Sequence, residues 1–167
     1  MSWKKCNCEE NKIHCKEVNF GAEIRYKKLS NLAKEPTRGS TTAAGYDLYA
    51  ATAGTTAIEP HQTVKIGTDL AFELPDYTFG AIFARSGLAT KKGLRPANCV
   101  GVVDSDYRGN VTVAIHNDSN ETMIIEPQER IAQLVLMSYI PMTFKEFDGE
   151  LSETDRGEGG FGSTGEK

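Results

Sequence analysis

The chain has 167 residues, which is enough for a single domain with a buried core. With 39% apolar and 25% charged residues, its composition is that of an ordinary soluble globular protein. The 19 basic and 23 acidic residues leave a formal net charge of −4, so we expect neither nucleic acid nor an anionic membrane as the partner. No apolar run has transmembrane length and residues 1–10 are polar, unlike a signal peptide, so we expect a cytoplasmic protein.

Residues 1–20 form an extension that is rich in potential metal ligands. They carry three thiols and an imidazole close together, at Cys6, Cys8, His14 and Cys15. The pattern Cys-x-Cys-x5-His-Cys matches no zinc-finger spacing, so two interpretations stay open: a metal site, or thiols without a role. Cys99 stands alone, and a reducing cytoplasm would keep all four cysteines as thiols.

The core is expected to span residues 21–147 and to consist of short strands. Residues 24–29 are predicted to be the opening strand, and residues 35–42 a loop. Apolar residues occupy alternate positions across residues 63–74, which is the two-residue period of a half-buried strand or pair of strands. Further segments of β type are residues 111–115, 124–125 and 131–140. Many short strands separated by turn residues favour an all-β sandwich, jelly roll or barrel.

A single short helix is predicted, at residues 87–92. The apolar pattern stops near the C-terminus, so residues 148–167 are predicted to be an arm. The end of this arm, residues 156–165, is rich in glycine and should be mobile when free. Arg156 suits a phosphate, the Gly/Ser/Thr backbone offers N–H groups to anionic oxygens, and Phe161 suits the face of a base. A disordered tail without a function is the alternative interpretation.

Five blocks of residues carry the candidate chemistry: 43–50, 84–89, 98–109, 129–134 and the glycine-rich end. Each block alone has an ordinary explanation, such as a turn, a helix cap or a surface ion pair. Together, and in this order, they resemble the five motifs of the trimeric deoxyuridine triphosphatases (dUTP diphosphatases), a resemblance that runs from about Ile24 to Gly165.

This resemblance implies a β jelly-roll subunit of β-clip type with one short helix and a flexible glycine-rich C-terminal arm. It also implies a homotrimer whose active sites are shared between subunits. The implied reaction is hydrolysis of dUTP to dUMP and pyrophosphate with Mg²⁺, which limits uracil in DNA and supplies dUMP for dTMP synthesis.

Hydrolysis of the α–β phosphoanhydride needs an oriented water, neutralised phosphate charge and a held leaving group. The resemblance assigns activation of the water to Asp104, whose ordinary alternative is the capping of a turn. Mg²⁺ prefers oxygen ligands, keeps several waters and usually binds through substrate phosphates. Asp47 matches a carboxylate that contacts the waters of the metal, and a structural hydrogen bond at a strand start is its alternative role.

The resemblance assigns phosphate binding to three further blocks. In the second motif Arg85, Ser86 and Gly87 resemble a phosphate clamp near a helix start. Gln133 matches an amide that reaches the α-phosphate from a neighbouring subunit, whereas Arg130 is expected to brace the structure. The γ-phosphate and the uracil face are assigned to residues of the arm, which would close as a lid: Arg156, Gly162, Ser163 and Thr164 for the phosphate, and Phe161 for stacking on uracil.

Selection of base and sugar is expected from the hairpin at residues 98–107. Asn98 is placed like the side chain that reads uracil, with backbone groups through Val102 and Val103 completing the recognition. Cytosine would leave these fixed groups unpaired, and buried unpaired groups are costly. Tyr107 matches a tyrosine that packs under the deoxyribose and would collide with a 2′-hydroxyl.

Two other functions are alternatives to dUTP hydrolysis. A dCTP deaminase of the same fold needs a glutamate at the position of Ala114, and alanine cannot transfer protons. A non-catalytic or moonlighting dUTP-binding module is the other alternative. A module that had lost activity would be expected to lack the aspartate or the arm, yet Asp104, Gln133 and the whole arm are present. Any additional interaction would be sought in residues 1–20.

Overall fold

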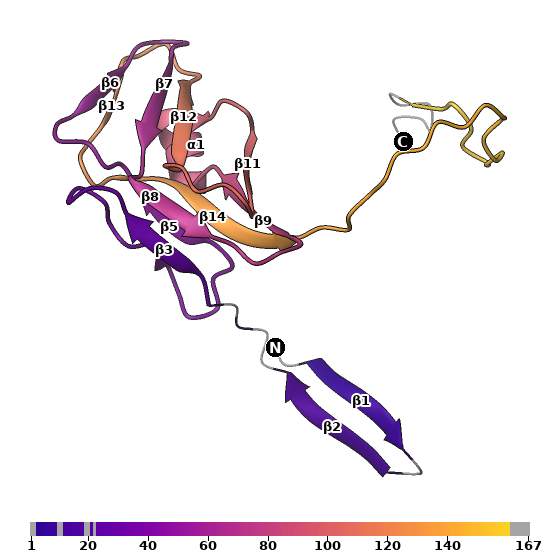
Figure 1. The fold of residues 1–167 in the computed structure, drawn as a ribbon. Helices are drawn as coiled ribbons and strands as arrows, with labels where there is room; N and C mark the ends of the chain where they lie inside the picture. Colours follow the sequence, from indigo (N-terminus) through magenta and orange to yellow (C-terminus); the bar gives the residue numbers. More distant parts are fainter. Residues whose placement is uncertain (1–2, 10–11, 19–20, 22, 161–167) are drawn as a thin grey trace.

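The computed structural model describes residues 3–9, 12–18, 21 and 23–160 (Figure 1). These residues form fourteen strands, β1 to β14, and one helix, α1. All of the strand pairs are antiparallel. The structure therefore confirms the all-β class and the single short helix that the sequence predicts.

The largest sheet has five strands and carries five of the candidate residues: Asp47, Val102, Val103, Asp104 and Gln133. Its strand order is β11-β9-β14-β5-β4, with bounds Val100–Asp104, Thr78–Phe83, Arg130–Ser138, Tyr46–Tyr49 and Thr37–Arg38. The short strand β4 lies within residues 35–42, which the sequence predicts to be a loop throughout. It pairs with β5 over only two residues, which is too short a run to leave a periodic apolar pattern.

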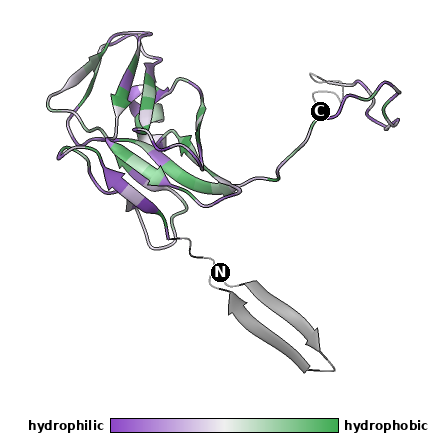
Figure 2. Ribbon diagram, viewed as in Figure 1, coloured by the Kyte–Doolittle hydropathy of each residue, from purple (hydrophilic) through white to green (hydrophobic). Residues whose placement is uncertain are grey.

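Three smaller sheets complete the body of the molecule. A three-stranded sheet has the order β10-β12-β7, with bounds Leu94–Pro96, Thr112–Asn117 and Thr63–Gly67. Two strand pairs accompany it: β13 with β6 (Met123–Ile125 and Thr56–Ile58), and β3 with β8 (Arg25–Lys28 and Leu70–Glu73). In Figure 2 the exposed strand β3 is coloured as hydrophilic, whereas apolar residues dominate β8 and β14.

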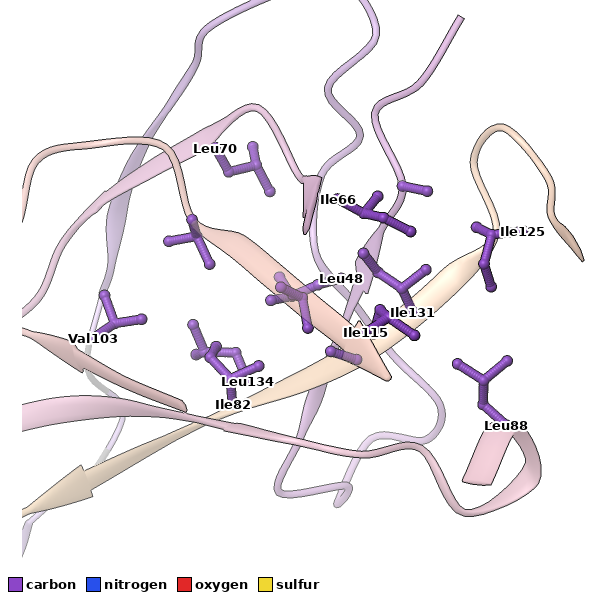
Figure 3. Close-up of a cluster of buried hydrophobic side chains, with 14 of the residues drawn as sticks. Leu48, Ile66, Leu70, Ile82, Leu88, Val103, Ile115, Ile125, Ile131 and Leu134 are labelled. Atoms are coloured by element: carbon purple, nitrogen blue, oxygen red, sulfur yellow. The ribbon is translucent and has the colours of Figure 1, made fainter. Parts of the chain in front are cut away.

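One apolar core joins these sheets (Figure 3). Leu48 of β5 and Ile131 of β14, in the five-stranded sheet, and Ile115 of β12, in the three-stranded sheet, are all fully buried. Along β12, Val113 and Ile115 are buried while Thr112 is exposed, as the alternation predicts. Burial of each such aliphatic side chain contributes roughly 1.5–3 kcal/mol. The two-residue period of the sequence is thus the direct trace of strands that each turn one face to this core.

The apolar alternation over residues 63–74 belongs to two strands in different sheets. β7 ends at Gly67 and β8 begins at Leu70, and between them Asp69 has a positive φ of 51°. The backbone therefore turns at Asp69, which tolerates this left-handed conformation better than most residues do. Of the two readings that the sequence leaves open, a single strand or a strand pair, the structure shows the pair.

The helix α1, Ser86–Lys92, begins one residue before its predicted start. It buries Leu88 and ends at Gly93, whose φ of 65° and N–H bond to the Ala89 carbonyl form a left-handed C-cap. Lys91 and Lys92 lie in its last turn, where positive charge is favourable. In the part of the chain that the structure describes, no helix has the length and apolarity needed to cross a membrane.

The N-terminal extension forms a hairpin of its own. It pairs β1 (Trp3–Glu9) with β2 (Lys12–Val18), and its register sets Cys6 opposite Cys15 and Asn7 opposite His14. The sequence predicts no strand here. Whether the cysteines form a metal site or are thiols without a function stays open between the two interpretations.

The last strand ends earlier than the apolar pattern of the sequence suggests. β14 stops at Ser138, and the chain then leaves the sheet as an extended segment (Figure 1). Ile140, Met142 and Phe144 are 85%, 76% and 89% exposed. These apolar residues belong to the predicted core range of 21–147, yet within one chain they do not join its core.

Candidate functional site

A cleft of about 300 Å³ opens between β9, β11 and β12. Its wall contains five residues that the sequence predicts for the site: Asn98, Val102, Val103, Asp104 and Tyr107. β11 supplies three of them and the turns at its two ends supply the others. The structure thus brings the predicted catalytic residue and the predicted base- and sugar-binding residues to one place.

Glycine at position 101 lets β11 lie close against β9. A Cβ atom there would stand 3.1 Å from the Ile82 Cβ and 3.5 Å from the Asn98 amide nitrogen. The first contact is tighter than ordinary packing and would push β11 away from β9, whereas the second is an ordinary van der Waals contact. Cys99, between these residues, adopts a positive φ of 59° and turns the chain into β11. Gly101 therefore lets β11 pack closely against β9 at the cleft wall.

Asp104 is the last residue of β11 and is exposed at the cleft. Its backbone carbonyl accepts the Tyr107 N–H at 3.1 Å, and Arg108 closes the same turn by donating to the Ser105 carbonyl at 2.6 Å. Within the described residues the Asp104 carboxylate has no hydrogen-bond partner. Backbone and arginine, rather than this carboxylate, hold the turn, so the acid is left free to meet a ligand.

Tyr107 lies directly over Gly109. A Cβ atom at position 109 would stand only 2.6 Å from the tyrosine Cζ, so any larger residue would displace the ring. The Tyr107 hydroxyl donates to the Asn110 carbonyl at 3.1 Å, and the residue is 45% exposed. The ring is thereby fixed at the rim of the cleft with one face available.

A second cluster surrounds the buried Asp47 of β5. The Arg85 Nε donates to Asp47 Oδ1 at 2.7 Å, and the Arg130 Nη1 donates to Asp47 Oδ2 at 3.3 Å. The Asp47 side chain is only 12% exposed, so both of its oxygens are committed to these guanidinium groups. The structural hydrogen-bonding role is the one seen here, and Arg130 braces the structure as predicted. A contact of Asp47 with metal-bound water stays a prediction.

Gln133 of β14 lies opposite Asp47 of β5 and Phe83 of β9. Its amide Nε2 donates to the Ala84 carbonyl at 2.9 Å. A Cβ atom at position 45 would stand 3.3 Å from the Gln133 Cδ, so Gly45 leaves room for this side chain. Gln133 is therefore anchored beside the segment that leads into Arg85.

The predicted phosphate-binding residues of the second motif are accessible. Ser86 and Gly87 are exposed in the first turn of α1. Arg85 uses only its Nε for Asp47, and the described residues leave its two terminal nitrogens without a hydrogen bond. These nitrogens can therefore donate to anionic oxygens. None of these residues lines the cleft, however, so a single chain holds two separate clusters.

Of the arm residues that are predicted to contact the substrate, the structure describes only Arg156. It is exposed, and its Nε donates to the Gly159 carbonyl at 2.8 Å. Gly157, with a positive φ of 48°, forms the turn between them. The other predicted contacts of the arm, Phe161, Gly162, Ser163 and Thr164, lie outside the described residues and stay predictions.

The cleft wall also includes Ile82, Asn110 and Thr112, which the sequence does not indicate as site residues. Ile82 reads as an ordinary strand residue of β9, and nothing in its local pattern marks it. Asn110 directly follows the Arg-Gly turn of the third motif, and this position was the available signal.

Arg95 of β10 forms a salt bridge with Asp118, the residue after β12. Its Nε and Nη2 donate to the two Asp118 oxygens at 2.6 and 3.0 Å. These hydrogen bonds, and then the charge of Asp118, raise the pKa of Arg95 above its usual value. The guanidinium is therefore a fixed positive charge at the base of the loop that carries Asn98.

A family model described as dUTPase matches residues 31–165. The chain belongs to the dUTPase family. The deoxyuridine 5′-triphosphate nucleotidohydrolase of Desulfitobacterium hafniense is 48% identical over 146 residues, which cover 86% of this chain and 95% of that protein.

Solved dUTPase structures also resemble this chain. The Staphylococcus bacteriophage 80alpha dUTPase with dUPNHPP is 32% identical, with a TM-score of 0.78 over 87% of this chain and 99% of that one. A mutant dUTPase from S. aureus phage phi11, described as revealing the coordination of a structural Mg(II) ion, is 26% identical. It has a TM-score of 0.69 over 77% of this chain and 98% of that one. The jelly-roll fold of dUTPases is thus the fold of this chain.

Membership of the dUTPase family fits the character of the cleft wall at β12. Ala114 lies on this wall, at the position where a deaminase of the same fold needs a glutamate. The methyl group cannot take up or release a proton, so the wall holds no acid–base group at that point. The deaminase alternative is not favoured.

Proposed function

We propose that this member of the dUTPase family hydrolyses dUTP to dUMP and pyrophosphate. The observation that carries the proposal is the cleft itself, in which a free carboxylate, an amide and a fixed aromatic ring meet: Asp104, Asn98 and Tyr107. The three groups match three tasks of the reaction, which are activation of water, recognition of the base and recognition of the sugar. The presence of all five motifs supports catalysis over a purely binding function.

In the proposed reaction Asp104 is the general base. Its carboxylate accepts a proton from a water whose oxygen attacks the α-phosphorus. A P–O bond forms, the bond from the α-phosphorus to the bridging oxygen breaks, and pyrophosphate leaves with the electron pair. The lack of a hydrogen-bond partner for this carboxylate among the described residues supports the assignment, because a committed acid could not orient the water.

Uracil is proposed to pair with Asn98 and with the backbone through Val102 and Val103. Asn98 lines the cleft together with Val102 and Val103, which supports this role. A cytosine would present a donor where uracil presents an acceptor, and the unpaired groups would lower its affinity. Tyr107 is proposed to pack under the deoxyribose and to exclude a 2′-hydroxyl.

The triphosphate is proposed to bind Arg85, Ser86, Gly87 and Gln133. These residues do not line the cleft of their own chain, so we propose a homotrimer in which one chain's phosphate cluster faces a neighbour's cleft. The exposed apolar residues after β14 support association between copies, since water-exposed isoleucine, methionine and phenylalanine gain from burial. The arm would complete the site through Arg156, Phe161, Gly162, Ser163 and Thr164.

The residues present fit Mg²⁺ that is held mainly by substrate phosphates. In the part of the chain that the structure describes, no group of three His, Cys, Asp or Glu residues is placed to hold a metal. Mg²⁺ commonly binds in this way, through phosphates and few protein carboxylates. When bound it would neutralise phosphate charge, and Asp47 is the proposed contact to its waters.

The test measures release of pyrophosphate from dUTP in the presence of Mg²⁺. The same assay with dCTP, dTTP and UTP as alternative substrates tests the assigned base and sugar specificity. We expect rapid turnover of dUTP alone, and its loss in Asp104→Asn. Ammonia release from dCTP would instead establish a deaminase. Tight binding of dUTP without hydrolysis would establish a non-catalytic module.

A further inference from the structure

Asn110 connects the cleft to a part of the chain that no ligand would touch. On the cleft side its backbone carbonyl accepts the Tyr107 hydroxyl at 3.1 Å. On the inner side its amide Nδ2 donates to Asp69 Oδ1 at 2.8 Å. Tyr107 lines the cleft, whereas Asp69 does not. Asn110 therefore links Asp69 to the tyrosine through one side-chain and one backbone hydrogen bond.

Asp69 is itself held firmly. Its second carboxylate oxygen accepts the Ser30 hydroxyl at 2.6 Å, and its backbone carbonyl accepts the Leu29 N–H at 2.8 Å. It forms the turn between β7 and β8, where both flanking residues are fully or almost fully buried. A carboxylate in this position is a rigid reference point for whatever it binds.

The amide of Asn110 has no substitute for this bond. Its Oδ1 is buried and has no hydrogen-bond partner among the described residues, so the bond to Asp69 is the only one seen for the side chain there. Without Asp69 a buried amide would lose all of its pairing, which is costly enough to make the segment rearrange. The position of the Asn110 carbonyl therefore depends on Asp69.

The tyrosine has little freedom to absorb such a rearrangement. Gly109 lies under its ring, close enough that a single added carbon would collide with it. A shift of the segment from Gly109 to Asn110 would move both the surface under the ring and the acceptor of its hydroxyl. Both supports of the ring thus belong to the segment that Asp69 holds.

We propose that Asp69 is a positioning residue for sugar selection. Through Asn110 it fixes the Tyr107 ring at the distance that admits a deoxyribose and excludes a ribose. This inference rests on the proposed function, because it concerns the preference for dUTP over UTP. It adds to that function a residue that does not line the cleft and does not touch the substrate.

The first test compares kcat/KM for dUTP and for UTP in four proteins: the unmodified chain, Asp69→Gly, Asp69→Asn and Asn110→Ala. Glycine removes the carboxylate without strain at a positive φ, so the loss is of the hydrogen bond. We expect the preference for dUTP to fall about tenfold in Asp69→Gly and in Asn110→Ala, the scale of one lost hydrogen bond. Asp69→Asn keeps an oxygen for the Asn110 amide and should restore the preference.

The matched control is Glu73→Ala, which removes a carboxylate that follows Asp69 closely in the sequence, at the end of β8. Glu73 forms an exposed ion pair with Arg25, away from Asn110. The preference of the Glu73→Ala variant for dUTP should equal that of the unmodified chain. A preference retained in Asp69→Gly and Asn110→Ala, with only the melting temperature lowered, would overturn the inference and leave a structural role.

The second test asks whether Asp69 acts through Tyr107. Tyr107→Phe keeps the ring and removes its bond to the Asn110 carbonyl. If the two residues act in one chain of contacts, Asp69→Gly combined with Tyr107→Phe should lose no more preference than either change alone. A double variant whose loss is the product of the two single losses would overturn the inference. An unmodified chain that does not prefer dUTP over UTP would overturn the proposed function instead.

Discussion

At the scale of single residues, this chain separates acids that are free from acids that are committed. Asp104 ends a strand at the cleft and has no hydrogen-bond partner among the described residues, whereas Asp47 is buried between two guanidinium groups. The same residue type therefore has two different tasks, set by its surroundings. Substitution of each should produce a different kind of defect.

Asp104→Asn should abolish turnover without weakening the fold. The amide keeps the size of the side chain but cannot accept a proton from water, so we expect kcat to fall by roughly 10²–10⁴. The KM for dUTP and the melting temperature should change little, because Asp104 is exposed and bonds nothing in the described part of the fold. Steady-state kinetics measures kcat and KM, and thermal melting measures the stability. A fall in kcat that is accompanied by a clear fall in melting temperature would contradict the assignment.

Asp47→Ala should destabilise the fold. It would leave Arg85 and Arg130 without their carboxylate, and breaking a buried pair costs roughly 3 kcal/mol. Chemical denaturation measures this free energy of unfolding. Gln133→Ala is the useful comparison, since it removes only one neutral hydrogen bond of the same cluster, worth about 1 kcal/mol. Equal stabilities of the two variants would show that Asp47 is not the anchor of the cluster.

At the scale of elements, the strands were the most predictable part of the chain. Val113 and Ile115 alternate with Thr112 because one face of β12 is buried, and such a face leaves its period in the sequence. The break at Asp69 left no such trace, since alternation continues on both sides of it. The bonds of Asp47 were also beyond local reasoning, because its partners lie 38 and 83 residues away along the chain.

The cleft could be predicted to a similar extent. Asn98, Asp104 and Tyr107 fall within residues 98–107, so proximity along the chain implied proximity in space. The hairpin predicted for this segment was wrong, because it holds one strand, β11, which pairs with β9. Asn110 was missed because its importance comes from Asp69, 41 residues earlier. Sequence patterns indicate which residues share a turn, and they do not indicate which distant side chain holds that turn in place.

The helix α1 offers a prediction about its C-terminus. Gly93 has a φ of 65°, where any residue with a Cβ is strained, and its Cβ would lie 3.3 Å from that of Ser119. Gly93→Ala should therefore cost about 1–2 kcal/mol of unfolding free energy and lower the melting temperature by several degrees. Gly87→Ala, in the open first turn of the same helix, should be neutral or stabilising, so a similar loss there would contradict this account.

At the scale of the whole molecule, the arm is a part of the proposed site that lies outside the folded core. The apolar core closes by the end of β14, while residues 139–160 contribute no strand. Removal of residues 156–167 should therefore leave the melting temperature unchanged. Turnover of dUTP should fall by about 100-fold or more, because the site would stay open to water. Full activity in the truncated chain would contradict a role for the arm.

The exposed apolar segment after β14 leads to a prediction about the proposed homotrimer. Ile140→Asp combined with Phe144→Asp would place two charges on side chains that are 85% and 89% exposed in one chain. If copies bury this segment against one another, light scattering should show the trimer replaced by monomer. Lys145→Asp places an acid on the same segment without removing an apolar side chain, and its mass should stay that of the trimer.

The separation of the cleft from the phosphate cluster has a genetic consequence. In an assembly where every site draws on two chains, a chain with a defective cleft still lends its Arg85 and Gln133 to a neighbour. A second chain with a defective phosphate cluster still offers its cleft. Two inactive alleles of this gene, one altered at Asp104 and the other at Arg85, should therefore complement each other when expressed together, whereas either allele alone behaves as a loss of function.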